Sequence, residues 1–151
     1  MTVDAVTLSA GEAKSLAIQR GYDAAGIARP HSASLPTRLR SVIVGVHATL
    51  DEAFDYEMFI EYDGRRKWYK PIYTALETLS FRLAEALRAH GLQAEALTYE
   101  HSIDLIDLKR AAVEAGLGIM GRNNLVVNRR YGPRVRFGAV RWTQTGRRTG
   151  R

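Results

Sequence analysis

Three glycines that fall within six residues, Gly116, Gly118 and Gly121, constrain the fold of this chain more than any other feature. Glycine has a high backbone entropy cost, and it is favoured where the main chain turns sharply or lies close to another group. Apolar residues at helical spacing precede the cluster, and two short apolar segments follow it. We therefore expect residues 104–140 to form a helix, a glycine turn and two strands separated by a second turn.

Two interpretations of the glycine cluster remain open from spacing alone. In the first, the helix ends at a left-handed cap, with Gly116 or Gly118 as the cap residue, and a hairpin follows. In the second, the glycines let the main chain approach a bound group. Arg122, Asn123 and Asn124 come directly afterwards, and they offer a fixed cation and two amides that both donate and accept hydrogen bonds.

The same region resembles a known family. The end of the corrinoid-binding domain of epoxyqueuosine reductases and reductive dehalogenases has a similar order of motifs. In this chain the matching residues are Ala115-Gly116-Leu117-Gly118, Gly121-Arg122-Asn123, the apolar segment 125–127, Tyr131-Gly132-Pro133 and the apolar segment 135–140. Weaker similarity at residues 20–28 and 41–46 extends the resemblance over most of residues 10–140.

The resemblance implies a nitroreductase-like α+β core, cobalamin as the cofactor, and reduction of an epoxide or a halide, with the epoxide linked to queuosine biosynthesis in tRNA. The cofactor-binding residues that it implies are Gly116, Gly118, Gly121, Arg122, Asn123, Asn124, Tyr131, Pro133 and Arg134. It also implies an aspartate as the proton donor. An alignment without gaps places Ser102 there, and Asp104 reaches the position only with a shift of two residues.

The chain has no cysteine. The resembled proteins continue into a ferredoxin-like part whose cysteines hold two iron–sulfur clusters, and such clusters require thiolate ligands. We therefore expect no cluster in this chain and no turnover by the chain alone, unless a cysteine-rich ferredoxin-like partner supplies electrons. A truncated or frameshifted, inactive relic of a longer protein is an alternative interpretation.

Composition indicates a soluble globular protein with one domain, because 46% of the 151 residues are hydrophobic and 25% are charged. No apolar stretch reaches the roughly 18 residues that a membrane helix needs, and the N-terminus does not resemble a signal peptide. The expected location is cytoplasmic. We expect a corrinoid-binding-like domain at residues 1–142 and a basic, disordered tail at 143–151. The sequence leaves homo-oligomer formation open.

Positive charge is concentrated after Glu114, where the chain has nine arginines and no acidic residue. Since the net charge of the whole chain is +6, the first 114 residues carry −3. A basic end attracts phosphates or carboxylates, although a solvated basic tail fits equally well. A tRNA-binding module that uses this arginine-rich end is therefore an alternative function. A flavin-binding reductase that holds FMN is another.

Local patterns predict an α+β sandwich with a mixed or antiparallel central sheet flanked by helices. The expected elements are a helix capped by Ser9 and ended by Gly21, strands at 22–28 and 41–48, a helix at 70–90, a strand at 92–99, a helix capped by Ser102 or Asp104, and strands at 125–127 and 135–140. For residues 49–68 a short helix packed on the core is favoured over an irregular lid.

Few residues outside the glycine region suggest chemistry. Asp104 and Asp107 are three residues apart on one helix face, so they form either an acid pair or a dipole-favoured pair at a helix start. The four histidines lack the mutual spacing of metal ligands.

Overall fold

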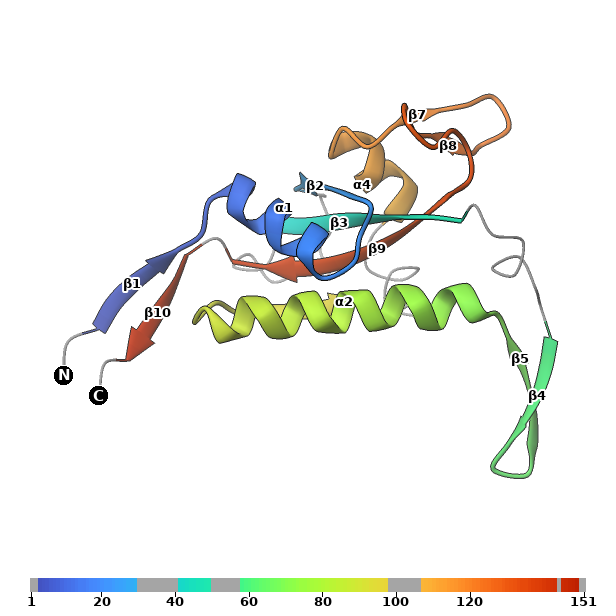
Figure 1. Ribbon diagram of the computed structural model, residues 1–151, viewed down its shortest axis with the longest axis horizontal. Helices are drawn as coiled ribbons and strands as arrows, with labels where there is room; N and C mark the ends of the chain where they lie inside the picture. Colours follow the sequence, from blue (N-terminus) through green and yellow to red (C-terminus); the bar gives the residue numbers. More distant parts are fainter. Residues whose placement is uncertain (1–2, 30–40, 50–57, 98–106, 144, 150–151) are drawn as a thin grey trace.

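The computed structural model describes residues 3–29, 41–49, 58–97, 107–143 and 145–149. Three helices lie in these ranges: α1 (Ala10–Gln19), α2 (Pro71–Ala89) and α4 (Leu108–Glu114). The strands there are β1 (Val3–Thr7), β2 (Ala24–Ala28), β3 (Ser41–Ala48), β4 (Met58–Tyr62), β5 (Arg65–Tyr69), β6 (Ala94–Leu97), β7 (Ile119–Met120), β8 (Val126–Val127), β9 (Val135–Trp142) and β10 (Thr145–Thr149). Figure 1 shows their arrangement.

A four-stranded antiparallel sheet with the order β2-β3-β9-β6 forms the centre of the fold. β3 pairs with β9 along its whole length, from Ser41 opposite Trp142 to Ala48 opposite Val135. The sequence predicts β3 at these residues and predicts that it is covered on both faces. Both predictions are confirmed, since residues 42–46 are all buried.

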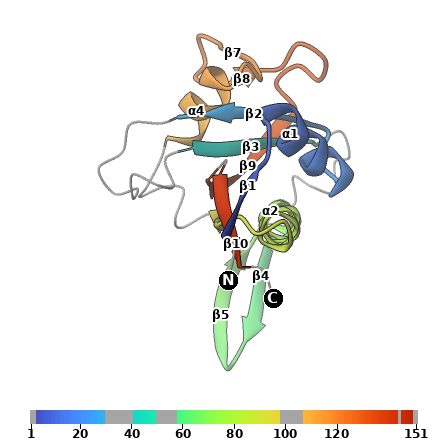
Figure 2. The same ribbon diagram turned by 90° about the vertical axis from the view of Figure 1, so that its left-hand side faces the viewer.

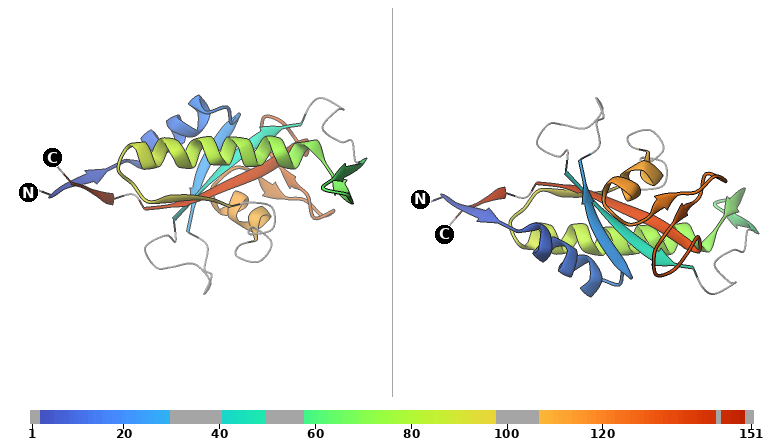
Figure 3. Two further views of the ribbon diagram at one scale, coloured as in Figure 1. Left: turned by 90° about the horizontal axis from the view of Figure 1, so that it is seen from below. Right: turned by 90° about the horizontal axis from the view of Figure 1, so that it is seen from above.

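Two apolar clusters cover the two faces of this sheet. Ile43 of β3 packs in the cluster to which α1 and α2 contribute, together with Leu83, Leu87 and Trp142. Alternate residues of the same strand, Val42, Val44 and Val46, pack in the cluster that includes Ala111 and Ala112 of α4. Figures 2 and 3 show α2 on one side of the sheet, and α4 with the β7–β8 hairpin on the other. The predicted α+β sandwich is confirmed, with a wholly antiparallel sheet.

The helix boundaries follow local chemistry. Ser9 caps α1 by accepting from Glu12 N, and the Glu12 carboxylate accepts from Ser9 N, so the predicted capping box is confirmed. Pro71 begins α2, where the missing N–H costs no helical hydrogen bond. Gly91 follows the end of α2 with a left-handed φ of 86°.

Tyr22 lies between α2 and the centre of the sheet. Gly45 and Gly138 are opposite each other in β3 and β9, and a Cβ on either one would lie within about 2.5 Å of the Tyr22 side chain. The Tyr22 hydroxyl is hydrogen-bonded to Ser80 Oγ on α2. Burial raises the pKa of Tyr22 to about 12, although the bond to Ser80 opposes the increase. The two glycines therefore provide space for an aromatic ring in the core.

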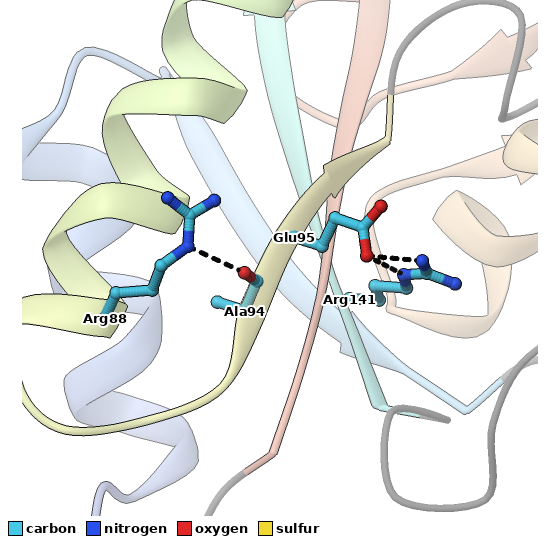
Figure 4. Close-up of polar contacts among 4 residues, drawn as sticks. All are labelled: Arg88, Ala94, Glu95 and Arg141. Carbon is cyan, nitrogen blue, oxygen red and sulfur yellow. Dashed lines mark hydrogen bonds and ion pairs between the residues drawn. The ribbon is translucent and has the colours of Figure 1, made fainter.

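Polar contacts attach β6 to its two neighbours (Figure 4). Arg88 of α2 donates from Nε to the carbonyl oxygen of Ala94, with a distance of 2.9 Å. Glu95 is directly opposite Arg141 of β9, and its carboxylate accepts from both Nε and a terminal nitrogen of that guanidinium. This ion pair joins β9 to β6, which is the edge strand of the sheet.

A hairpin of β4 and β5 replaces the helix that is favoured for residues 49–68. Asp63 and Gly64 connect the strands with φ values of 52° and 70°, as in a tight hairpin turn with two left-handed residues. The prediction of a helix is therefore wrong for residues 58–68, because the Asp-Gly turn signal outweighs the aromatic content. The lid alternative does not describe this regular hairpin either. Residues 50–57 lie outside the described ranges.

β1 and β10 form a second ribbon, with Val3 opposite Thr149 and Thr7 opposite Thr145. Residues 145–149, which composition assigns to a disordered tail, are therefore in a strand. Their lack of core-forming side chains does not prevent this, since strand pairing uses main-chain groups. The β1–β10 ribbon projects past the C-terminal end of α2, and the β4–β5 hairpin projects from the N-terminal end of α2 (Figure 1).

Within the described ranges, no helix is both long enough and apolar enough to cross a membrane.

Candidate functional site

The glycine cluster lies between α4 and the β7–β8 hairpin. Ala115 is the C-cap of α4, and Gly116 follows it with a left-handed φ of 79°. In the hairpin, Ile119 is opposite Val127 and Met120 is opposite Val126. The interpretation of a left-handed helix cap followed by a hairpin is therefore confirmed, with Gly116 as the cap.

The other two glycines allow close packing inside the hairpin. A Cβ on Gly118 would lie 2.6 Å from the carbonyl oxygen of Val127. A Cβ on Gly121 would lie 3.0 Å from Asn123 Oδ1 and 3.3 Å from the carbonyl oxygen of Leu125. At Gly116, in contrast to the other two glycines, a Cβ would have no atom within 4 Å. Gly118 and Gly121 therefore have structural reasons to be glycine that require no ligand.

The tip of the hairpin exposes both apolar and amide groups. Ile119 is 71% exposed, Met120 43% and Leu125 38%. Arg122, Asn123 and Asn124, which the sequence singles out, are exposed in the connecting turn. None of these three apolar residues is among the binding residues that the sequence predicts, although the Ile-Met pair between two glycines is a visible signal. An apolar surface beside hydrogen-bonding groups is suited to an amphipathic ligand.

Lys109 holds the turn against α4. Its Nζ donates to the carbonyl oxygen of Asn124 at 2.8 Å. Asn124 itself has a φ of 62°, and its N–H donates to the carbonyl oxygen of Gly121. Gly121 N in turn donates to the carbonyl oxygen of Leu125. Hydrogen bonds therefore fix the turn that carries the exposed groups of the tip. Lys109 contributes one of these bonds, and sequence spacing did not reveal its role.

Asn128 organises the following Tyr131-Gly132-Pro133 turn. Its side-chain Oδ1 accepts from the N–H groups of Arg130 at 2.9 Å and Tyr131 at 3.0 Å. Its Nδ2 donates to the carbonyl oxygen of Leu117 at 2.7 Å, and its main chain exchanges two hydrogen bonds with Gly132. This buried side chain therefore joins the turn to the base of the hairpin. Its role depends on Leu117, eleven residues earlier, so local sequence gave no signal for it.

The remaining predicted residues lie at this turn. Tyr131 is half-buried, with the Arg130 guanidinium 5.5 Å from the centre of its ring, and Pro133 is exposed. Arg134 is exposed and donates from Nε to the carbonyl oxygen of Thr49 at 3.2 Å. The predicted binding residues thus form two groups, one on the hairpin and one on the turn after β8, with Asn128 between them.

Asp104, the predicted proton donor, lies outside the described residues, and so does Ser102. The N-cap of α4 is Asp107, not Ser102 or Asp104 as expected, and its carboxylate accepts from Arg110 N at 3.2 Å. The helix-start interpretation of Asp107 is therefore confirmed. In the ranges that the structure describes, no group of three or more His, Asp or Glu side chains has an arrangement that could hold a metal ion.

Comparison with solved structures finds a similar fold. The catabolic reductive dehalogenase NpRdhA, N-terminally tagged and in complex with 3-bromo-4-hydroxybenzoic acid, matches 88% of this chain with a TM-score of 0.65 and 18% sequence identity. A second structure of the tagged dehalogenase matches with a TM-score of 0.62 and 16% identity. The chain spans only 20% of the length of that protein. At this identity the similarity establishes the fold.

No protein-family model matches the chain, and no curated protein matches it either.

Proposed function

We propose that this protein is a cobalamin-binding module, and that the β7–β8 hairpin and the turn after β8 contact the cofactor. One coincidence supports the proposal. The residues whose order resembles the corrinoid-binding domain form an exposed hairpin in a fold similar to part of a reductive dehalogenase. The motif and the fold are different observations, and both support this proposal.

The exposed groups of the hairpin fit a corrinoid chemically. Cobalamin has a broad, largely apolar macrocycle surrounded by amide arms, and it carries one phosphate. Ile119, Met120 and Leu125 provide exposed apolar surface. Asn123 and Asn124 provide amides that can exchange hydrogen bonds with the amide arms, and Arg122 provides a cation for the phosphate. Gly116 is the glycine at which the main chain is open to a ligand.

Each group has a definite role in this proposal. The apolar residues exclude water from one side of the macrocycle, the amides fix its orientation, and Lys109 holds the turn that carries the amides. Bound cobalamin would supply the reductive chemistry at its cobalt, while the protein positions the cofactor. Asp104 remains the proposed proton donor to a reduced substrate.

Turnover requires electrons from outside this chain. Because the chain has no cysteine, it provides no thiolate for an iron–sulfur cluster. We therefore include a cysteine-rich, ferredoxin-like partner in the proposal. The motif resemblance supports either an epoxide of the epoxyqueuosine type or an organic halide as the substrate, and the fold similarity to a reductive dehalogenase supports the halide.

Absorbance titration with hydroxocobalamin, followed by gel filtration, tests the binding directly. We expect a saturable spectral change and corrinoid that elutes with the protein. Ile119→Ser combined with Met120→Ser should weaken binding roughly tenfold, since it removes exposed apolar contact area. Ile18→Ser is the control, because Ile18 is a 47% exposed residue of α1, and α1 lies away from the β7–β8 hairpin (Figure 1).

Two results contradict the proposal. Failure of the unmodified protein to retain corrinoid would exclude the function, and equal affinities in the hairpin and control variants would exclude the site. Titration with FMN in parallel tests the alternative cofactor. Saturable FMN binding without corrinoid binding would replace the proposal with a flavin-binding reductase.

A further inference from the structure

We infer that the turn at residues 129–134 is a binding loop for a phosphate-bearing ligand. Arg129, Arg130 and Arg134 lie within six residues, and all three side chains are exposed. The last 37 residues of the chain, which include Arg129 and Arg130, contain no aspartate or glutamate. A dense group of guanidinium groups on one turn creates a local positive potential.

The backbone of this loop is fixed by the protein itself. Asn128 is 8% exposed, and its Oδ1 accepts from the N–H groups of Arg130 and Tyr131. Two main-chain hydrogen bonds between Asn128 and Gly132 close the same turn. Guanidinium groups that extend from a fixed backbone lose less conformational freedom on binding than those of a flexible tail. This distinguishes the loop from an ordinary solvated charge cluster.

Arg129 and Arg130 have no carboxylate partner in the part of the chain that the structure describes. Arg141, in contrast, is paired with Glu95. Arg130 contacts the Tyr131 ring, which holds the guanidinium near the turn without neutralising its charge. Asp23 lies at the end of β2 that adjoins this part of the sheet, and its carboxylate accepts from Ala48 N at 2.7 Å. The two arginines therefore retain positive charge for an external anion.

Side chains, rather than main-chain amides, would hold the anion. Asn128 already uses the N–H groups of Arg130 and Tyr131. A guanidinium presents several N–H donors in a plane that matches pairs of phosphate oxygens. Two adjacent arginines also match the multiple charges of a phosphate better than the single charge of a carboxylate. A phosphate group is therefore the favoured ligand chemistry. Arg134 is also among the residues assigned to cobalamin, whereas Arg129 and Arg130 are not. The experiments below therefore change Arg129 and Arg130 and leave Arg134 in place, which keeps the two proposals distinguishable.

Calorimetric titration of the full chain with inorganic pyrophosphate at low ionic strength tests the site. The variant Arg129→Gln/Arg130→Gln should bind roughly tenfold more weakly or worse, because it removes charge-assisted hydrogen bonds. Arg65→Gln/Arg66→Gln is the charge-matched control, since both arginines are exposed on the distant β4–β5 hairpin. The control should bind within about twofold of the unmodified protein, apart from the weak effect of net charge.

Two additional measurements separate a specific loop from charge alone. Asn128→Ala, checked for folding by circular dichroism, should weaken binding although every arginine remains. Malonate, a dicarboxylate, should bind clearly more weakly than pyrophosphate. The inference is overturned if the unmodified protein shows no saturable binding, if both double variants lose affinity equally, or if malonate binds as tightly as pyrophosphate. Loss of pyrophosphate binding with cobalamin binding intact would leave the proposed function unaffected.

Discussion

At the scale of single residues, the core depends on a fit between distant positions. Tyr22 occupies the space that Gly45 and Gly138 leave in neighbouring strands, and its hydroxyl contacts Ser80 of α2. Interior packing is dense enough that one added methyl group is felt. No local pattern relates these four positions, and from the sequence alone Tyr22 is only the first residue of a predicted strand.

Tyr22→Phe should lower the free energy of unfolding by about 1–3 kcal/mol, because Ser80 is 1% exposed and would lose its partner. Urea denaturation measures the change. Tyr22→Phe/Ser80→Ala serves as the control, and it should recover part of the loss because it removes both hydrogen-bonding groups. An additive loss in the double variant would show that the hydroxyl pair contributes little.

The same residue predicts a dependence of stability on alkaline pH. Burial raises the pKa of Tyr22 from 10.0 to about 12, so the folded state holds the phenolic proton more tightly than the unfolded state. The resulting stabilisation is complete below pH 10 and is lost as the pH rises through about 12. The difference in melting temperature between the unmodified protein and Tyr22→Phe should therefore decrease over this window. A constant difference would contradict the burial of the phenol.

Gly118→Ala should destabilise the protein by about 1–3 kcal/mol, since the new Cβ would collide with main-chain atoms of β8. Gly11→Ala is the control. Gly11 lies in α1, where the nearest atom to a Cβ is 3.9 Å away, so alanine should be neutral or stabilise by up to about 1 kcal/mol. Thermal melts of both variants measure the contrast. Equal melting temperatures would show that the hairpin shifts easily to accept the methyl group.

At the scale of elements, the sequence predicted what local signals determine. The Ser9 capping box, β3 and the start of α2 at Pro71 agree with the structure. The β4–β5 hairpin differs from the predicted helix because Asp63 and Gly64 adopt the left-handed conformations of a tight turn, which the aromatic content of the segment does not indicate. In the described part of the chain, β1, which lies near the N-terminus, pairs with β10. Its pairing spans almost the whole chain, so no local pattern indicated it.

In the candidate site, too, local sequence predicts some features, whereas contacts between distant residues determine others. The sequence correctly predicted a helix cap at Gly116 and strands at β8 and β9, but it predicted no strand at residues 119–120, which pair with β8. It did not locate Lys109 or Asn128, because their hydrogen-bond partners are fifteen and eleven residues away and become neighbours only in the folded chain. The exposure of Ile119 and Met120 also depends on tertiary structure. Contacts between elements therefore decide which residues of the motif are accessible.

The ion pair between β6 and β9 leads to a prediction for one element. Glu95→Gln should cost about 1 kcal/mol or less, because the Glu95 side chain is 46% exposed and solvent screens its charge. The cost should decrease in high salt. Glu85→Gln on the exposed face of α2 is the control and should change stability by less than about 0.5 kcal/mol. A salt-independent loss for Glu95→Gln would indicate an effect other than charge pairing.

At the scale of the whole molecule, two narrow ribbons extend from opposite ends of a compact sandwich (Figure 3). β4 contacts mainly β5, and β1 contacts mainly β10, whereas β3 contacts a strand on each side. An isolated two-stranded ribbon is only marginally stable in water. The ribbons therefore add little to the stability of the core, and each ribbon strand has an edge without a partner strand in the described structure, which is available for pairing with another chain.

Hydrogen exchange followed by mass spectrometry can test this division of stability. Amides of β4 and β5 should exchange through local opening, far faster than those of β3, which should exchange only with global unfolding. The hydrogen-bonded amides of α2 provide an internal control, because α2 joins the β4–β5 hairpin to the core and has seven buried residues. If the hairpin amides prove as protected as β3, another surface must cover the hairpin in solution. A concentration-dependent increase in that protection would identify the surface as a second copy of the chain.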